Sequence, residues 1–446
     1  MGQRDAPGTQ RSRTGRPGPR RAARPGRGGR PGGAAADHGR LRPARRARPQ
    51  PVRQARGHRR PGRRAAALRR VRRRRALPRD RGDRPGPAHP GRPRRPARRR
   101  RGEQRRGGVG VSGARVPAVA VVGAGAFGLR HVAAYRSLGV PVTALVDPDP
   151  ATRARVAAEH DVPRTFATVA ELLAAGAPAA ASVCVPGPAH RAVAVALLAA
   201  GVPVLVEKPL AATVGDAAAI VAAARTHGVL CQPGHILRHS APHRALYDAV
   251  RAGRLGQVLA VSSRRDRPRT LSRLFPHEHP ALLTAVHDID LAIWYAQAPV
   301  VEVRAAARTR PGSASPVLVW AELRHANDVV SSIRNSYLLP EHTPNHTSDL
   351  VEVYGTDGVA HVDLGHPTLL VQAERTEAPD WLLSPLDGGG ALAAELRHFI
   401  GRVTGTEPSA VVPLADGLHV VQVAAAVADS AAAGGAPRRI SPDPLS

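Results

Sequence analysis

From Pro117 to about residue 232, short apolar segments alternate with longer amphipathic segments of helical periodicity. This alternation is typical of parallel βαβ units and disfavours an all-β sandwich or a helical bundle. It predicts strands at 118–122, 142–146, 181–185, 203–206 and 229–232. The intervening segments predict helices at about 127–138, 151–159, 168–175, 189–200 and 213–227. We therefore expect one parallel α/β domain that ends near residue 235.

Beyond Gly234 the predicted strands follow one another with few helices between them. The strands are expected near 257–266, 300–309, 316–324, 328–337, 349–355 and 358–363. The helices are expected near 241–252, 281–296, 391–404 and 414–433. Successive strands joined by short turns favour antiparallel pairing. The sequence thus predicts an α/β protein whose C-terminal part is an α+β domain with a mostly antiparallel open sheet.

Residues 1–115 differ sharply in composition from the rest of the chain. They hold more than half of the 66 Lys and Arg side chains but few of the 34 Asp and Glu side chains, and they contain no Phe, Tyr, Trp, Ile or Lys. Such a segment has no residues for a hydrophobic core, and its arginines would bind nucleic acid only without sequence specificity. We predict a disordered, dispensable basic leader at 1–115, followed by domains at 116–235 and 236–440.

The compartment is predicted from patterns that the sequence lacks. It has no secretory signal pattern, and no run of about 18 apolar residues is free of charges and turn residues. Cys184 and Cys231 lie in strand-like segments without zinc-ligand spacing. We therefore expect a cytoplasmic protein with reduced thiols, no membrane span and no bound metal.

A glycine-rich turn joins the first predicted strand to the first helix. Its residues are Gly123, Ala124, Gly125, Ala126, Phe127 and Gly128. In this strand–turn–helix context the glycines permit a tight turn, close approach of a pyrophosphate and close helix packing, while the helix N-terminus attracts the anion. The turn predicts a Rossmann domain that binds a dinucleotide through Gly123, Gly125, Ala126, Phe127 and Gly128.

The nature of the dinucleotide is predicted from Asp147, at the end of the second strand. A carboxylate there can accept hydrogen bonds from both hydroxyls of the adenosine ribose and repels a 2′-phosphate. This favours NAD. Arg153 lies a few residues further on and leaves NADP open as an alternative.

Lys208, within Val206-Glu207-Lys208-Pro209, is the only lysine among the 446 residues. The chain uses arginine for every other fixed positive charge. A lysine kept in that background indicates chemistry that needs a compact ammonium group whose pKa can shift.

Further motifs follow in a fixed order along the chain. They are Val185-Pro186 with His190, Gly234-His235 with Arg238, and His287-Asp288-Ile289-Asp290-Leu291. Together with the glycine turn, Asp147 and Glu207-Lys208-Pro209, this set resembles the Gfo/Idh/MocA oxidoreductases, which include glucose-fructose oxidoreductase and inositol 2-dehydrogenase. The resemblance covers roughly residues 117–440. It implies a Rossmann domain followed by a domain that binds substrate and forms oligomers.

The resemblance also implies roles for individual side chains. Lys208 would polarise the reacting oxygen, and His287 would be the acid/base group. Further cofactor contacts are implied for Pro186, His190, Glu207 and Lys208, and substrate contacts for His235, Arg238 and Asp288.

One position departs from the family pattern. Members often carry an aspartate four residues before the histidine, where this chain has Leu283. Two alternatives stay open: Asp290, on the same helical face as His287, replaces that aspartate as a third catalytic group, or the proton path is shorter.

The expected reaction is hydride transfer between NAD(P) and a secondary alcohol or ketone. The resemblance alone supplies the substrate class, a sugar, inositol or related polyol, and the expectation of a homodimer or homotetramer. Two other hypotheses are a non-catalytic NAD-binding sensor or regulator, which Leu283 supports, and a redox-assisted elimination or epimerisation with tightly held cofactor. The retained Lys208 favours the dehydrogenase over the sensor.

Overall fold

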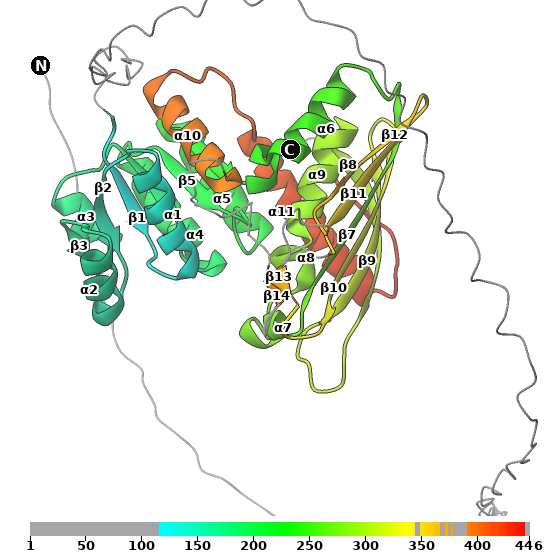
Figure 1. Cartoon of the computed structure of the whole chain (residues 1–446), viewed down its shortest axis with the longest axis horizontal. Coiled ribbons are helices and arrows are strands. Elements are labelled where there is room, and N and C mark those ends of the chain that lie inside the picture. Colours follow the sequence, from blue (N-terminus) through cyan, green and yellow to red (C-terminus); the bar gives the residue numbers. More distant parts are fainter. Residues whose placement is uncertain (1–115, 344–347, 366–370, 373–375, 378–389, 442–446) are drawn as a thin grey trace, which may run out of the picture. The chain divides into compact units, whose positions relative to one another are not determined.

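The computed structural model describes residues 116–343, 348–365, 371–372, 376–377 and 390–441, all of which belong to one compact unit of the chain (Figure 1). The predicted leader lies outside the described residues. The predicted fold class is confirmed: a parallel sheet is followed by a mixed, mostly antiparallel sheet.

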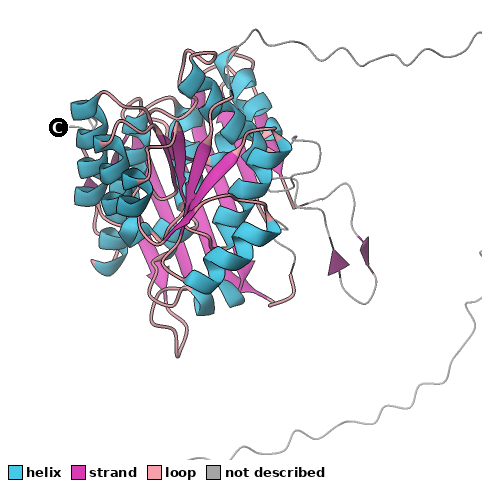
Figure 2. Ribbon diagram, turned by 90° about the vertical axis from the view of Figure 1, so that its left-hand side faces the viewer, coloured by secondary structure: helices cyan, strands magenta, loops and turns pink. Residues whose placement is uncertain are grey.

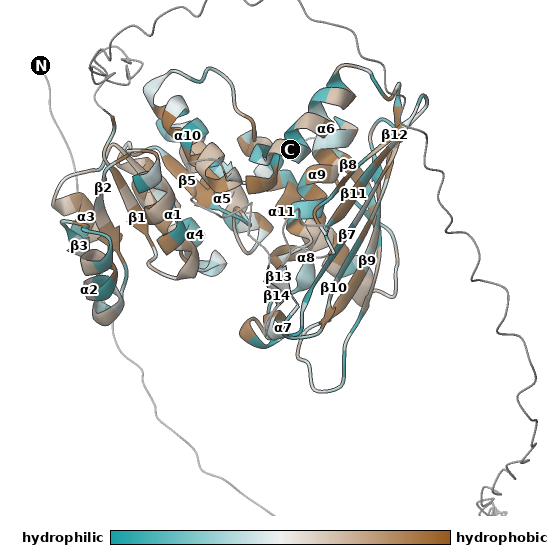
Figure 3. Ribbon diagram, viewed as in Figure 1, coloured by the Kyte–Doolittle hydropathy of each residue, from teal (hydrophilic) through white to brown (hydrophobic). Residues whose placement is uncertain are grey.

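Six parallel strands form the first sheet in the order β3-β2-β1-β4-β5-β6. Their bounds are Val119–Val122 (β1), Val142–Val146 (β2), Thr165–Phe166 (β3), Ala180–Val183 (β4), Val204–Glu207 (β5) and Cys231–Gly234 (β6). β3 is absent from the predictions because two residues are too few to show a periodicity. Hydrophobic residues, brown in Figure 3, fill buried strands such as β5. The strand order reverses between β1 and β4, so the carboxyl ends of these strands border the crevice where such sheets bind ligands.

Helices flank the strands on both sides (Figure 2). In the first part they are α1 (Ala126–Ser137), α2 (Pro150–Glu159), α3 (Val169–Ala174), the 3₁₀ helix η1 (Gly187–Ala189), α4 (His190–Ala199) and α5 (Val214–His227). The side chains of Asp149, Thr168 and Thr213 accept backbone N–H groups at the starts of α2, α3 and α5. Caps of this kind typically stabilise a helix by about 1 kcal/mol.

The second sheet has seven strands in the order β12-β11-β7-β10-β9-β8-β15. Their bounds are Val258–Pro268 (β7), Val300–Arg308 (β8), Leu318–His325 (β9), Val330–Leu339 (β10), Leu350–Gly355 (β11), Val359–Asp363 (β12) and Arg438–Arg439 (β15). β7 and β10 pair in parallel and the other neighbours pair antiparallel. The short strands β13 (Val371–Gln372) and β14 (Thr376–Glu377) pair separately.

The helices of the second part include one break that the sequence did not predict. They are η2 (Ile236–His239), α6 (Ala241–Arg251), α7 (Thr270–Leu274), α8 (Pro280–Leu283), α9 (Val286–Ala296), α10 (Ala391–Thr404) and α11 (Leu414–Ala432). The helix expected at 281–296 is divided into α8 and α9. At the break, the backbone of Thr284 leaves helical geometry with φ −127°. Its hydroxyl donates to Asn335 Oδ1 at 2.7 Å and lies 2.8 Å from the Tyr337 hydroxyl. These contacts hold the break against β10.

One face of the second sheet carries helices, and none of the described helices covers the other, which we call the open face. In Figure 1, α6, α8, α9 and α11 lie on the same side of this sheet. Along β9, buried residues alternate with the exposed Trp320, Glu322 and Arg324. Exposed residues therefore share one face of the strand, as the period-2 geometry of a strand requires.

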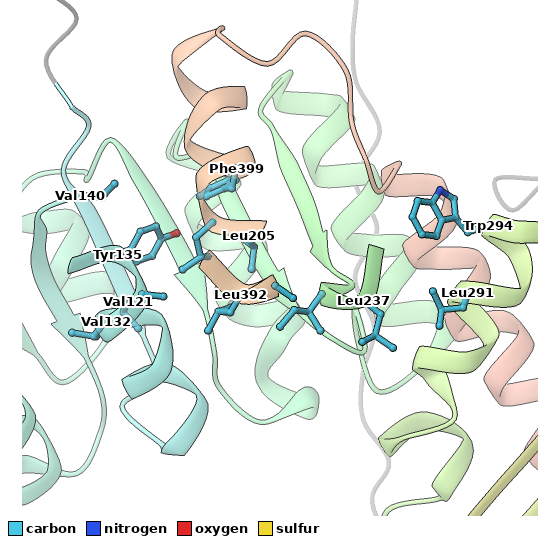
Figure 4. Close-up of a cluster of buried hydrophobic side chains, with 14 of the residues drawn as sticks. Val121, Val132, Tyr135, Val140, Leu205, Leu237, Leu291, Trp294, Leu392 and Phe399 are labelled. Atoms are coloured by element: carbon cyan, nitrogen blue, oxygen red, sulfur yellow. The ribbon is translucent and has the colours of Figure 1, made fainter. Parts of the chain in front are cut away.

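Helix α10 returns the chain to the first sheet, where it packs on α1 and η2. Leu392 and Phe399 of α10 lie with Tyr135 and Leu205 in one buried apolar cluster (Figure 4). The same cluster extends to Leu237 of η2 and to α9. A continuous core therefore connects the parallel sheet with the helices that carry the second group of motifs.

Candidate active site

The glycine turn has the geometry that a bound dinucleotide requires. Gly123 has φ +98°, and a Cβ there would lie 2.6 Å from the carbonyl oxygen of Cys184. A Cβ on Gly128 would lie 1.9 Å from the carbonyl oxygen of Gly123. At Gly125, no atom of the described residues lies within 4 Å of such a Cβ, so the backbone is open to a ligand. Steric clashes thus require glycine at positions 123 and 128. At position 125 the lack of a side chain leaves the backbone accessible to a ligand.

Helix α1 begins at this turn with its first N–H groups free of any side-chain cap from the described residues. Ala126 and Phe127 occupy its first positions. Uncapped N–H groups and the positive end of the helix dipole suit a pyrophosphate. The turn and α1 therefore fit the dinucleotide that their sequence predicts.

Asp147 connects the glycine turn to the start of α2. Its carboxylate accepts the N–H of Ala124 at 2.8 Å and the N–H of Asp149 at 3.0 Å. Arg153 donates to the backbone carbonyl oxygens of Asp147 and Pro148, at 2.6 and 3.0 Å. The guanidinium of Arg153 is thus held by the backbone of this loop.

The His190 ring contacts two loops, the one after β4 and the one after β5. One ring nitrogen lies 2.8 Å from the carbonyl oxygen of Val185, and the other lies 2.9 Å from that of Pro209. Pro186 is the residue before η1 in the loop that His190 holds. Both polar atoms of the ring are engaged with backbone, so any contact of His190 with a cofactor would use the carbon atoms of its ring.

Lys208 follows β5 and reaches across to the second group of motifs. Its Nζ donates to the carbonyl oxygen of Leu283, the last residue of α8, at 2.8 Å. Burial lowers the pKa of Lys208 to about 8; Glu207 raises the pKa, and Arg265 and Arg267 lower it further. The ammonium is therefore mostly charged at neutral pH and close to its titration range.

Glu207, which precedes the lysine, is held by two donors. Its Oε1 lies 2.9 Å from Nε2 of His131 in α1, and its Oε2 accepts the backbone N–H of Lys208 at 3.1 Å. The Glu207 side chain is buried beside His131. It thus positions the backbone of Lys208, whereas contact with a cofactor remains a prediction.

His287 lies in the first turn of α9, one short connection after Leu283. Burial and the nearby cations Lys208 and Arg265 hold the pKa of its imidazole well below the usual value. The buried Nδ1 has no hydrogen-bond partner among the residues that the structure describes. The ring is therefore neutral at neutral pH, with a nitrogen able to take part in proton exchange.

Asp290, predicted as a catalytic group, is engaged by Arg238. The guanidinium donates from Nε to Oδ2 at 3.0 Å and from Nη2 to Oδ1 at 2.7 Å, and both side chains are 1% exposed. Arg238 also donates to Asp416 at 2.9 Å. This bidentate pair fixes α9 against η2 and α11, so a structural role competes with the catalytic role of Asp290 and with substrate binding by Arg238.

Asp288 is engaged in the same way by Arg265 of β7. Nε and Nη2 of Arg265 donate to the carboxylate at 2.8 and 3.0 Å, and Nη1 donates to Asp349 at 2.6 Å. Arg267 also bonds Asp349. The predicted substrate contact of Asp288 would need this buried pair to open.

His235, the remaining residue of the predicted substrate group, is 1% exposed. Its Nδ1 lies 3.7 Å from Oδ1 of Asp290, beyond hydrogen-bond distance. Neither ring nitrogen has a hydrogen-bond partner among the described residues. Besides burial, Lys208 and His235 thus both lower the pKa of His287, and Asp288 and Asp290 are paired with arginines.

Sequence reasoning missed Arg265 and Arg267, whose charges act on Lys208 and His287, and Asp349, which pairs with both arginines. A signal for the two arginines was present in part: Arg265 lies within the strand expected near 257–266, and Arg267 follows two residues later, just beyond that strand, on the same face that β7 buries. The partner Asp349 had no such signal, because it lies more than 80 residues away in the chain.

Two cavities lie in the described part of the chain. One of about 520 Å³ lies between α6 and β12, and one of about 440 Å³ is lined by Arg238, Trp294 and Asp416. Neither is lined by Lys208 or His287. Within the described ranges, no group of three or more His, Cys, Asp or Glu could hold a metal ion. None of the described helices is long and apolar enough to cross a membrane.

Comparison with known proteins supports the predicted family. Residues 118–235 match the family model "Oxidoreductase family, NAD-binding Rossmann fold", and residues 243–361 match the "GFO/IDH/MocA C-terminal domain". An inositol 2-dehydrogenase of Saccharopolyspora erythraea is 31% identical over 59% of this chain and 84% of that protein. An inositol 2-dehydrogenase of Leifsonia xyli is 33% identical over 46% of this chain, but the match spans only 63% of that relative.

Solved structures share the fold. The scyllo-inositol dehydrogenase of Lactobacillus casei, solved with bound NAD(H) and scyllo-inositol, superposes with a TM-score of 0.64 at 17% identity over 73% of this chain and 99% of that one. At this identity the likeness bears on the fold alone. The two family models and the Saccharopolyspora relative together identify the chain as a member of the NAD-binding Gfo/Idh/MocA oxidoreductase family.

Proposed function

We propose that this protein is an NAD-dependent dehydrogenase that interconverts a secondary alcohol and a ketone of an inositol, sugar or related polyol. The observation that carries the proposal is Lys208, the only lysine of the chain, held 2.8 Å from the Leu283 carbonyl directly before the helix of His287. The substrate class is supported by relatives named inositol 2-dehydrogenase and 1,5-anhydro-D-fructose reductase.

The roles of the two side chains follow from their charge states. Lys208 would donate a hydrogen bond from Nζ to the reacting oxygen and stabilise the negative charge that develops there. The neutral imidazole of His287 would accept the hydroxyl proton during oxidation and return it during reduction. Bound NAD would supply the hydride acceptor at carbon 4 of its nicotinamide ring. The chain's own contribution is to hold the alcohol, the ammonium and the imidazole in line.

NAD is proposed over NADP because of the contacts around Asp147. The carboxylate stands at the end of β2 beside the glycine turn. Arg153, the cation that left NADP open, donates to two backbone carbonyl oxygens of the same loop. A 2′-phosphate would therefore meet a negative charge, and the nearby guanidinium would first have to leave its backbone partners.

A second copy of the chain is proposed as the partner of the open face of the second sheet. Trp320, Val330 and Val359 are between 44% and 57% exposed there. Their strand partners Arg334, Ala260 and Tyr354 lie on the same face. An exposed face that includes large apolar side chains is suited to burial against a partner.

The function is tested with wild type, Lys208→Met and Lys208→Arg. Titration with NAD and NADP measures cofactor binding, and the absorbance change of the nicotinamide measures turnover on a panel of inositols, sugars and their keto forms. We expect wild-type turnover and a loss of at least about a hundredfold in kcat for Lys208→Met, with NAD binding retained. Lys208→Arg keeps the charge but not the compact donor, so its expected activity is also low. NAD binding without turnover on any compound would instead support a sensor or regulator.

A further inference from the structure

A histidine lies on the buried face of α1, close after the glycine turn. His131 is 0% exposed, and the centre of its ring lies 5.7 Å from that of Phe127, one helical turn earlier. Tyr135, one turn later, also contacts the ring, at 6.4 Å. Figure 4 shows Tyr135 directed from α1 into the apolar cluster that also contains Leu205 of β5. This face of α1 is therefore turned toward the strand that ends at Glu207.

His131 contacts Glu207 through one of its ring nitrogens. Nε2 lies 2.9 Å from Oε1 of the carboxylate, and Glu207 is 7% exposed. Because a carboxylate only accepts hydrogen bonds, Nε2 is the donor and carries the hydrogen. Nδ1 is buried and has no hydrogen-bond partner in the described part of the chain. The bond to Glu207 is thus the contact that fixes the orientation of this ring.

The other carboxylate oxygen of Glu207 contacts the lysine. Oε2 accepts the backbone N–H of Lys208 at 3.1 Å. Glu207 is the last residue of β5, and Lys208 follows it directly. Each oxygen of this buried carboxylate therefore has one donor: His131, from a different element, and the backbone of the next residue. A buried carboxylate keeps its charge when donors of this kind satisfy it.

The charge of Glu207 supports the charge of Lys208. Burial lowers the pKa of the lysine most, and Glu207 is the strongest group that raises it. The hydrogen bond of Nζ goes to the neutral carbonyl of Leu283, at 2.8 Å. A neutral carbonyl stabilises an ammonium less than a carboxylate would, so the ammonium depends on Glu207 for support.

Other charged and titratable groups act on the same two residues. Arg265 and Arg267 lower the pKa of Lys208, and Glu278 raises it less than Glu207 does. The groups within electrostatic reach of Glu207, besides its hydrogen-bond partners, are Cys184, His235 and Glu395.

We propose that His131 is a positioning residue for Lys208 and acts through Glu207. It holds the carboxylate so that Glu207 fixes the backbone of the lysine and keeps its own negative charge. The proposal rests on the dehydrogenase function above only where it treats Lys208 as catalytic. The helix whose N-terminus fits a pyrophosphate thus also holds the carboxylate that supports the lysine.

The single lysine of the chain allows a test that does not depend on turnover. Lys208 is the only lysine and is partly exposed. Acetic anhydride acetylates the neutral amine but not the ammonium. The extent of acetylation at a series of pH values, measured by mass spectrometry on the peptide that contains Lys208, therefore follows the titration of this one group. For the wild-type, full-length protein without cofactor we expect a midpoint at about pH 8.

The variants separate the hydrogen bond of His131 from its packing. His131→Phe keeps a buried ring but leaves Oε1 of Glu207 without its donor, so the carboxyl binds a proton more readily. We expect the Lys208 midpoint to fall by about half a pH unit or more. His131→Gln keeps an N–H donor and should restore most of the wild-type midpoint. His325→Phe replaces another fully buried histidine, at the end of β9, and is the control with an unchanged midpoint.

The route through Glu207 is tested by a double-mutant cycle. Glu207→Gln removes the charge itself and should lower the Lys208 midpoint at least as far as His131→Phe does. The double variant should have the midpoint of Glu207→Gln alone, because both changes act through one carboxylate. The alkaline limb of kcat/KM for polyol oxidation should move in the same direction in each variant, with NAD binding of His131→Phe within twofold of wild type.

Two results would overturn the proposal. One is a His131→Phe protein of lower stability with the wild-type midpoint, which would give His131 a packing role only. The other is a double variant whose midpoint lies clearly below that of Glu207→Gln, since His131 would then act on Lys208 by another route. If the midpoints shift as expected but wild type oxidises no polyol, the dehydrogenase function is rejected and the positioning of Lys208 by His131 stands.

Discussion

At the residue scale, the site depends on a lysine whose charge is held near its titration range. The pKa of Lys208 is lowered to about 8, chiefly by burial, and the ammonium donates to a backbone carbonyl rather than to a carboxylate. A neutral carbonyl stabilises the charged form less than a carboxylate would. The consequence of Leu283 is therefore a lysine that loses its proton at lower pH.

This charge state predicts the alkaline limb of the pH profile. Because the pKa is lowered, Lys208 is charged below about pH 8 and neutral above it, so kcat/KM should fall as pH rises through about 8. Leu283→Asp places a carboxylate beside the ammonium and should move this limb upward by about one pH unit. Leu283→Asn has nearly the same shape without the charge and is the matched control. The test is kcat/KM measured from pH 6 to 10 for wild type, Leu283→Asp and Leu283→Asn. If the alkaline limb is identical in the three proteins, a group other than Lys208 causes it.

The motifs made some residues of the candidate site predictable and left their partners unpredictable. Lys208 could be singled out because a single lysine in an arginine-rich chain is a compositional signal. The roles of Asp288 and Asp290 could not be settled, because a carboxylate on a helix is equally suited to catalysis and to an ion pair. Their partners Arg265 and Arg238 lie 23 and 52 residues away.

At the element scale, α9 is fixed by two buried ion pairs, made by Asp288 and Asp290 just after His287. Asp288 pairs with Arg265 of β7, and Asp290 pairs with Arg238 of η2. Each pair is bidentate, which restricts rotation as well as translation of the helix. The position of His287 is thus set by arginines. The periodicity of the sequence indicates that Arg265 is buried, but it does not indicate which carboxylate it pairs with.

If Asp290 serves as the buried ion-pair partner of Arg238, its removal should destabilise the protein. Asp290→Asn leaves the buried charge of Arg238 with Asp416 as its remaining carboxylate, so we expect the free energy of unfolding to fall by about 3 kcal/mol. NAD binding measured well below the unfolding transition should be unchanged. The control is Glu159→Gln, which removes an exposed pair with Arg155 and should change stability by less than about 1 kcal/mol. Unchanged stability together with a large loss of kcat would instead support Asp290 as a third catalytic group.

At the scale of the whole molecule, the order of elements was predictable and the contacts between distant elements were not. Alternating segments sufficed for the parallel sheet, since each βαβ unit is local in sequence. The parallel pairing of β7 with β10 joins strands far apart in the chain, and it interrupts an otherwise antiparallel sheet. The return of α10 to α1 is also long-range. The packing of α10 on the first part of the chain could therefore be found only in the folded structure.

The open face of the second sheet carries the last prediction. Trp320, at 54% exposed, lies opposite Arg334 of β10 and Ala306 of β8 on that face. If a second copy covers the face, Trp320→Glu buries a charge in the contact and should shift the protein from dimer or tetramer toward monomer in sedimentation velocity. Phe275→Glu changes another exposed aromatic residue, which follows α7, and serves as the control. A wild type that sediments as a monomer, or a Trp320→Glu protein that sediments as wild type does, would show that this face is not the contact between copies.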